Sequence, residues 1–182
     1  MSTRPSGYAK QPDQWYQEPR CAIDALLNVE SFAGPGIVWD PCCGAGNIPD
    51  ACLARGLAVS GSDIVDRGYR HHHTLDFLTS SARVDHIVCN PPFDLAVEFV
   101  LHGLKLVTGK VAIIQRTTWL EGDRRYNRLF RLGHLARVWQ FRKRLSMPPG
   151  GCGIEPKNGS IAFAWFVFEV SHNGPWTGGW LP

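Results

Sequence analysis

Long apolar runs are absent from this chain of 182 residues. None approaches the roughly 20 consecutive apolar residues that a membrane-spanning helix requires. The first residues, MSTRPSGYAKQPDQ, also lack the apolar stretch of a secretory signal peptide. The composition is not that of a disordered protein either, because 44% of the residues are hydrophobic and 19% are charged. We therefore expect a folded cytoplasmic protein without a membrane partner.

The chain also lacks the marks of a disulfide scaffold and of a metal site. Six cysteines would suggest a disulfide framework only in a short secreted chain, so free thiols are expected. The run His71-His72-His73 cannot turn three consecutive side chains toward one ion, and no cysteine or histidine at ligand spacing accompanies it. The sequence predicts no metal.

The length suits one ordinary α/β domain, and no internal repeat or second boundary is visible. Residues 1–14 are predicted to form a flexible arm, residues 15–170 a single domain and residues 171–182 a loop-like tail. Helical patterns and short apolar runs alternate along the domain, which indicates a parallel sheet with helices on both faces. The helical patterns cover 21–29 and 48–55, and the strand-like runs cover 37–39, 57–63, 86–89 and 110–114.

The last part of the domain follows another pattern. Two β-rich runs, 135–141 and 160–170, are joined by the segment Met147–Gly159. That segment is too rich in proline and glycine for a crossover helix. The two runs therefore predict an antiparallel pair at one edge of the sheet.

Charge is concentrated in one segment, although the formal net charge is only +3. Residues 124–144 hold eight of the 19 basic residues and no acidic residue, with aromatic side chains interleaved. Such a segment can neutralise phosphates and stack on bases. Taken alone, it is equally typical of a solvated face whose aromatic residues point to the core.

A glycine-containing turn follows the first predicted strand and reads Asp40-Pro41-Cys42-Cys43-Gly44-Ala45-Gly46. Glycine lets a ligand approach the backbone where a side chain would collide. Pro49 stands where a dinucleotide-binding fingerprint needs its third glycine, which disfavours a nicotinamide or flavin enzyme. The turn therefore predicts a ligand other than a dinucleotide at the strand ends.

Two acidic residues extend this prediction. Asp63 ends the second strand, where a carboxylate can accept both hydroxyls of a ribose. Asp76 can accept from an adenine amine while Phe77 packs against the ring. Each aspartate alone is more often a turn residue, but together they outline an adenosine site.

The segment Asn90-Pro91-Pro92-Phe93 follows the fourth predicted strand. Two prolines form a stiff turn without N–H donors, so Asn90 Oδ1 and the Pro91 carbonyl can both accept from one planar amine. These bonds return lone-pair density to the nitrogen, and Phe93 offers a surface on which the ring can stack. The segment predicts activation of an amine.

These motifs together resemble the class I S-adenosylmethionine-dependent methyltransferases. Within that class they are similar to the enzymes that modify the N6 amine of adenine in DNA, and the small size resembles phage or mobile-element enzymes. The resemblance covers roughly residues 15–170. It implies a Rossmann-like α/β fold, with a mostly parallel seven-stranded sheet, an antiparallel edge strand and helices on both faces. The implied cofactor is S-adenosyl-L-methionine.

The resemblance implies roles for individual residues. Tyr16-Gln17-Glu18-Pro19 is similar to a YxTP segment that helps to hold the cofactor, although Glu18 stands where threonine is usual. The implied catalytic residues are Asn90, Pro91, Pro92 and Phe93. The implied cofactor-binding residues are Tyr16, Pro19, Asp40, Pro41, Gly44, Gly46, Asp63, Ile64, Asp76 and Phe77.

The activity implied is direct transfer, in which the amine attacks the sulfonium methyl in line and positioning provides most of the catalysis. A base in duplex DNA would be flipped into the pocket and stacked on Phe93. The basic segment would then hold phosphates near the site. The residues expected to do so are Arg124, Arg125, Arg128, Arg142, Lys143 and Arg144.

Other substrates stay open at this point. The same chemistry would suit an RNA base amine or a protein glutamine amide, although tyrosine is commoner than phenylalanine after NPP for the amide. A catalytically silent module that binds cofactor or nucleic acid is a further alternative, against which the intact NPPF argues. A specificity that is short or loose is expected, or one supplied by a loop such as 147–159.

Overall fold

The computed structural model describes residues 12–32, 34, 36–154 and 159–182. Residues 1–11 of the predicted arm and residues 155–158 of the proline-rich segment lie outside this part of the chain. All six cysteines lie within it and are free thiols. No helix in the described ranges is long and apolar enough to cross a bilayer.

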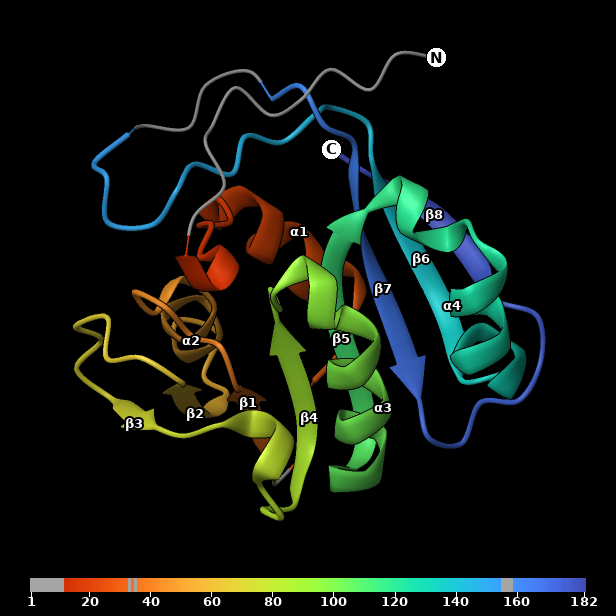
Figure 1. Ribbon diagram of the computed structural model, residues 1–182, viewed down its shortest axis with the longest axis horizontal. Helices are drawn as coiled ribbons and strands as arrows, with labels where there is room; N and C mark the ends of the chain where they lie inside the picture. Colours follow the sequence, from red (N-terminus) through yellow and green to blue (C-terminus); the bar gives the residue numbers. More distant parts are fainter. Residues whose placement is uncertain (1–11, 33, 35, 155–158) are drawn as a thin grey trace.

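Helices and strands alternate through most of the first two thirds of the chain (Figure 1). Pro19 is the N-cap of the first helix, where its missing N–H breaks no hydrogen bond. The elements are α1 (Arg20–Val29), β1 (Ile37–Asp40), α2 (Asn47–Leu53), β2 (Ala58–Asp63), β3 (His72–Thr74), β4 (Val84–Cys89), α3 (Ala96–Leu106) and β5 (Val107–Arg116). Then follow α4 (Asp123–Arg128), β6 (Leu135–Phe141), β7 (Phe163–Glu169) and β8 (Thr177–Leu181). Five short 3-10 helices lie between them: η1 (Pro12–Gln14), η2 (Phe77–Thr79), η3 (Phe93–Leu95), η4 (Thr117–Leu120) and η5 (Phe130–Leu132).

The strands form one sheet in the order β3-β2-β1-β4-β5-β7-β6-β8. The five strands β1 to β5 are parallel, and β7 runs antiparallel to both β5 and β6. The predicted parallel sheet and its antiparallel pair, now β6 and β7, are thus confirmed. Because β7 reverses direction between them, β5 and β6 point the same way and end at the same edge of the sheet.

The sheet has eight strands rather than the predicted seven, because the end of the tail forms β8 parallel to β6. Gly178 and Gly179 suggested a loop, but here glycine permits close packing. A Cβ atom at Gly179 would come within 2.3 Å of the Trp139 ring. The prediction of a loop-like tail is corrected for Thr177–Leu181.

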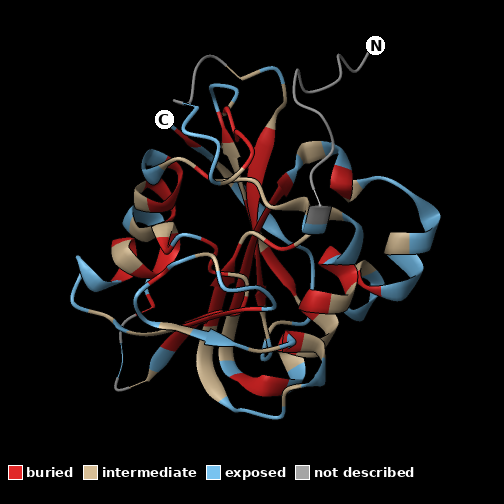
Figure 2. Ribbon diagram, turned by 60° about the vertical axis from the view of Figure 1, so that its left-hand side comes forward, coloured by how far each residue is buried: buried red, intermediate tan, exposed pale blue. Residues whose placement is uncertain are grey.

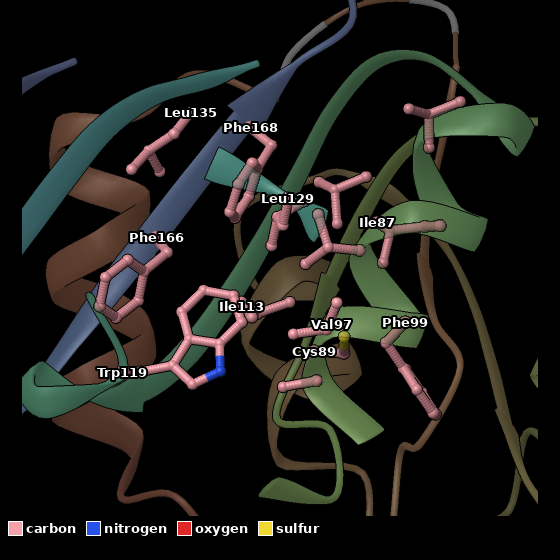
Figure 3. Packing of buried hydrophobic residues seen from close by; sticks show 14 of the residues in the cluster. Ile87, Cys89, Val97, Phe99, Ile113, Trp119, Leu129, Leu135, Phe166 and Phe168 are labelled. Atoms are coloured by element: carbon pink, nitrogen blue, oxygen red, sulfur yellow. The ribbon is translucent and has the colours of Figure 1, made fainter. Parts of the chain in front are cut away.

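Alternate residues of the central strands face opposite sides of the sheet, as the two-residue period of a strand requires. Val38, Val88 and Ala112 pack with α1 and α2 on one face, whereas Trp39 and Ile87 pack with α3 on the other. The central strands are therefore buried on both sides (Figure 2). Figure 3 shows part of the hydrophobic cluster on the α3 side of the sheet, where Trp119 of η4 lies next to Phe166 of β7 and Ile113 of β5.

Candidate active site

Three parallel strands end side by side at one edge of the sheet. β1 ends at Asp40, β2 at Asp63 and β4 at Cys89, directly before Asn90. The register pairs Asp40 with Gly61 across β1 and β2. Parallel pairing therefore brings the glycine turn, the acidic residue that ends β2 and the asparagine after β4 to a common edge, where ligands bind in open α/β sheets.

The glycine turn is tied to the end of β2 by hydrogen bonds. The Gly44 N–H donates to Asp63 Oδ2 over 3.0 Å, and the Cys43 N–H donates to the Ser62 carbonyl over 2.8 Å. Gly44 has a φ of 52° and Gly46 a φ of 93°, both in the region that favours glycine. A Cβ at Gly44 would lie 2.5 Å from the Trp15 indole nitrogen, so the turn requires glycine both for its conformation and for its packing.

Asp40 lies beneath this turn rather than in the cavity. It is 1% exposed, and its Oδ1 accepts from the Cys42 N–H over 3.1 Å. Burial raises the pKa of Asp40 well above its usual value, and repulsion from the Glu18 carboxyl raises it further. The side chain thus shapes the backbone of the turn.

A cavity opens above the strand ends, which is where small molecules bind in many α/β proteins. Nine of the residues expected in the site line it: Tyr16, Pro41, Gly44, Asp63, Ile64, Asp76, Phe77, Asn90 and Pro92. Pro19, Asp40, Gly46, Pro91 and Phe93 are not among its lining residues. Most of the expected site is therefore assembled around one cavity.

Asp76 and Phe77 take different positions at the rim. Asp76 caps η2 by accepting from the Leu78 N–H over 3.0 Å, and it is exposed. Phe77 is 2% exposed and packs edge-on against Trp39 with ring centroids 5.2 Å apart. Phe77 therefore contributes to the wall of the cavity mainly through its place in the core.

Asn90 is oriented by two acceptors from the N-terminal segment. Its Nδ2 donates to the Tyr16 carbonyl over 2.8 Å and to Glu18 Oε2 over 3.0 Å. A carbonyl can only accept, so the amide nitrogen must face this segment. Oδ1 is consequently directed away from both acceptors.

Glu18 is a buried carboxyl in contact with Asn90. It is 7% exposed, and burial raises its pKa to about 7, although its hydrogen bonds to the backbone and to Asn90 oppose that rise. A carboxyl with this pKa is half ionised near neutral pH. The departure from the YxTP pattern, with glutamate in place of threonine, thus places an ionisable group beside Asn90.

Phe93 stands next to the cavity and already has ring partners. Its ring is parallel to that of Tyr16, with centroids 5.9 Å apart and planes 9° apart. The Arg116 guanidinium carbon lies 5.2 Å from the Phe93 centroid. A base that stacked on Phe93 would have to share or replace these contacts.

The segment 13–18 crosses the cavity and is paired with the proline-rich segment. Tyr16 and Pro149 form an antiparallel bridge, and the Gly150 N–H donates to the Trp15 carbonyl over 3.0 Å. Asp13 pairs with Arg67 at 3.2 Å, and Gln14 Nε2 donates to Asp94 over 2.6 Å. Part of the predicted arm therefore belongs to the wall of the site.

Sequence reasoning did not place Trp15 and Arg67 in the wall of the cavity, nor the Glu18 carboxyl beside Asn90. The Arg67 guanidinium carbon stacks 4.4 Å from the Trp15 ring centroid. These residues come from loops, and their contacts join positions far apart in the chain. The only signal available in the sequence was the glutamate in place of threonine in the YxTP-like segment.

The basic segment is divided by the fold into two parts. Arg142, Lys143 and Arg144 follow β6 and so lie at the same edge as Asn90, and Arg124 lies in α4 shortly after the end of β5. Arg137 lies near the start of β6 and pairs with the buried Glu30. The aromatic residues are likewise divided, since Phe141 is buried whereas Tyr126 is 58% exposed.

Several of these basic side chains also have partners within the protein. The Arg125 guanidinium donates to the backbone carbonyls of Trp119 and Glu121, which stabilises η4. Arg128 pairs with Glu98 at 2.9 Å, and Arg144 donates to the Ser160 carbonyl over 2.9 Å. Arg124, Arg142 and Lys143 are exposed, and they are the members best placed to meet an external anion.

The three histidines do not converge on a common point. His72 and His73 lie on β3, on which successive side chains point to opposite faces. Within the described ranges, no group of three or more histidine, cysteine, aspartate or glutamate side chains could hold a metal ion.

Comparison with solved structures defines the class of fold. No family model and no curated protein matches the chain. A type I restriction-modification methyltransferase subunit from Streptococcus thermophilus superposes with a TM-score of 0.60 at 14% identity, covering 88% of this chain and 46% of that one. Magnesium protoporphyrin IX methyltransferase from Synechocystis, solved with bound SAH, gives a TM-score of 0.56 at 16% identity and covers 84% and 83%.

A third similar structure is TrmN from Thermus thermophilus, with a TM-score of 0.54 at 20% identity. The alignment covers 81% of this chain and 47% of TrmN. The chain thus spans about half the length of the restriction-modification subunit and of TrmN. The protein has the Rossmann-like fold of class I methyltransferases, as the sequence predicted.

Proposed function

We propose that the protein transfers a methyl group from S-adenosylmethionine to the N6 amine of adenine in DNA. The observation that carries this proposal is the orientation of Asn90, whose Nδ2 is held by Tyr16 and Glu18 at the edge of the cavity. Oδ1 is then available as an acceptor for an amine. The glycine turn and Asp63 line the same cavity, where an adenosine group would bind.

The lining residues fit the proposed cofactor. Each Asp63 oxygen accepts one backbone N–H and retains capacity for a ribose hydroxyl. Ile64 and Leu75 offer apolar surface to an adenine ring. When bound, S-adenosylmethionine supplies an electrophilic sulfonium methyl group. The likeness to a methyltransferase solved with SAH supports this choice.

The chain's own residues would position and polarise the amine. Asn90 Oδ1 and the Pro91 carbonyl would each accept one of its hydrogens, which raises electron density on the nitrogen. Pro92, at φ −50° and ψ 128°, is followed by η3 and holds Phe93 next to the cavity. Catalysis by this arrangement is chiefly positioning of the two reactants.

The basic side chains near the edge of the sheet that holds Asn90 support DNA as the substrate. Arg124, Arg142 and Lys143 are exposed, and Arg116 lies beside Phe93. Together they could hold the phosphates of a flipped nucleotide. The likeness to a restriction-modification subunit favours DNA further.

The test is a methyl-transfer assay with labelled S-adenosylmethionine and three acceptors offered side by side: mixed-sequence duplex DNA, total RNA and a protein extract. We expect label in DNA, and digestion of that DNA to nucleosides should release N6-methyl-2′-deoxyadenosine. Label in RNA or in glutamine would redirect the proposal to those substrates. No label in any acceptor, with cofactor bound, would favour a silent binding module.

Neutralising the exposed part of the basic segment should weaken DNA binding. We expect the variant Arg124→Gln/Arg142→Gln/Lys143→Gln to lower the slope of log K against log salt by about 2 to 3, because each phosphate contact contributes about 0.9. Arg125 is left intact because it stabilises η4. Fluorescence anisotropy with a labelled duplex at several salt concentrations measures the slope.

The matched control is Arg83→Gln/Lys105→Gln. Both residues are exposed and lie near the starts of β4 and β5, at the opposite edge of the sheet. Their removal should leave the slope nearly unchanged. An unchanged slope in the triple variant would return the segment to a solvated face.

A further inference from the structure

Glu18 is the buried carboxyl that contacts the candidate catalytic residue. Its Oε2 accepts from Asn90 Nδ2, and the Asn47 side chain donates to the Glu18 carbonyl over 3.0 Å. Glu18 also lines both the main cavity and a neighbouring one on the side of Arg20 and Asp50. It therefore stands directly behind Asn90, next to the proposed site of methyl transfer.

We propose that Glu18 is a positioning residue that orients and polarises the Asn90 amide for the target amine. This inference rests on the proposed function, which it deepens by adding a residue to the same site. In this arrangement Glu18 does not touch the amine, and its effect passes through one amide group.

The polarisation follows from hydrogen bonding within a conjugated amide. An ionised carboxylate that accepts from Nδ2 forms a charge-assisted hydrogen bond, which is stronger than a neutral one. The bond shifts electron density from nitrogen toward Oδ1, and hydrogen bonds in such a chain strengthen one another. Oδ1 then accepts more strongly from the amine, whose nitrogen becomes positive as it is methylated.

The Tyr16 carbonyl and the Glu18 carboxyl have different effects on the Asn90 amide. The carbonyl holds the orientation of Asn90 at any pH, because it cannot donate. Glu18 adds charge only when it is ionised. Loss of that charge should therefore slow transfer without turning the amide over.

The groups that face Glu18 leave it free to titrate. The charge of Glu18 raises the pKa of Asp40 at the end of β1, and it also raises the pKa of the Cys43 thiol in the glycine turn and of the Cys89 thiol at the end of β4. Asp63 acts in the same direction on Asp40, and Arg20 and Asp50 line the neighbouring cavity with Glu18. Burial raises the pKa of Glu18 to about 7. The charged form, and with it the rate, should increase as the pH rises through that value.

The experiment compares the pH profiles of wild type and Glu18→Gln with labelled S-adenosylmethionine and duplex DNA. In wild type, kcat/KM for the cofactor should rise with pH to a plateau, with a midpoint near the pKa of the free enzyme, about 7. Glu18→Gln should lose this limb, since glutamine does not titrate. At pH 8.5 its kcat should be roughly tenfold lower and its KM for the cofactor nearly unchanged.

Two controls separate this role from a structural one. Asp85→Asn makes the same chemical change at the start of β4, far from the site, and should keep the wild-type profile. Glu18→Gln should melt no lower than wild type at pH 8, because a buried amide costs less than a buried carboxylate. A persistent acidic limb in Glu18→Gln, or a change in KM alone, would overturn the inference.

A measurement that needs no turnover separates this inference from the proposed function. The NMR signal of the Asn90 side-chain amide should shift as the pH passes through 7, and the shift should vanish in Glu18→Gln. An amide signal that does not titrate would overturn the coupling itself. A titrating signal in a protein that methylates no acceptor would instead overturn the proposed function and the catalytic role of Glu18 with it.

Discussion

Replacing Asn90 by alanine should lower kcat for methyl transfer by about a thousandfold, or about 4 kcal/mol of transition-state stabilisation. The variant removes the acceptor Oδ1, and with it one of the two groups that raise electron density on the amine. Cofactor affinity should change little, because Asp63 and the glycine turn lie on other strands. Single-turnover transfer with saturating cofactor, together with calorimetric binding of S-adenosylmethionine, separates the two effects.

The control for this variant is Asn28→Ala on α1. Asn28 is exposed and accepts from Arg55 on the surface over 2.8 Å, so its loss should leave both rate and affinity as in wild type. Transfer at the wild-type rate by Asn90→Ala would rule out amine activation by this side chain. A loss of cofactor binding as large as the loss of rate would assign Asn90 to the cofactor site instead.

The residues predicted best from the sequence are those set by local rules. Asp63 ends a strand, and Gly44 and Asn90 follow strands; their apolar runs are visible in the sequence, and parallel pairing then brings the three residues to one edge. The turn at Gly44 also has a local cause, since its positive φ favours glycine. Strand ends and turns can therefore be derived without knowing the rest of the fold.

The residues that were missed depend on contacts between distant segments. Glu18 meets Asn90 across 72 positions, and Trp15 packs on Gly150. β8 escaped notice for the same reason, because Gly179 is required by the ring of Trp139 rather than by a turn. Burial determines the properties of such residues. The glutamate that stands where threonine is usual becomes, once buried, a carboxyl with a pKa of about 7.

The division of the basic segment has a topological cause. A run of charge in the sequence carries no information on which side chains end at the same edge of a sheet. Arg137 lies near the start of β6, where it pairs with the buried Glu30. Arg142 follows the end of β6 and therefore lies at the edge of the sheet that holds Asn90. Only the strand direction, set by the antiparallel β7, tells the two apart.

Replacing Asp63 by alanine should raise the dissociation constant of S-adenosylmethionine by roughly a hundredfold. That factor corresponds to about 3 kcal/mol, the loss expected for hydrogen bonds to a charged group. Asp63 Oδ2 also accepts from Gly44 and Oδ1 from Val65, so the variant removes acceptors of the turn as well. Calorimetry measures the affinity, and circular dichroism checks that the variant is folded. Asp66→Ala is the control, since Asp66 is an exposed carboxyl of the loop that follows β2.

A cofactor analogue without ribose hydroxyls distinguishes direct binding from support of the turn. If Asp63 accepts from these hydroxyls, wild type should bind 2′,3′-dideoxy-S-adenosylhomocysteine much more weakly than S-adenosylhomocysteine. Asp63→Ala should bind the two almost equally, because the interaction is already lost. This double-mutant cycle reports the coupling between carboxylate and hydroxyls alone, since any damage to the turn affects both ligands alike. Equal discrimination by wild type and variant would show that Asp63 acts only through Gly44 and Val65.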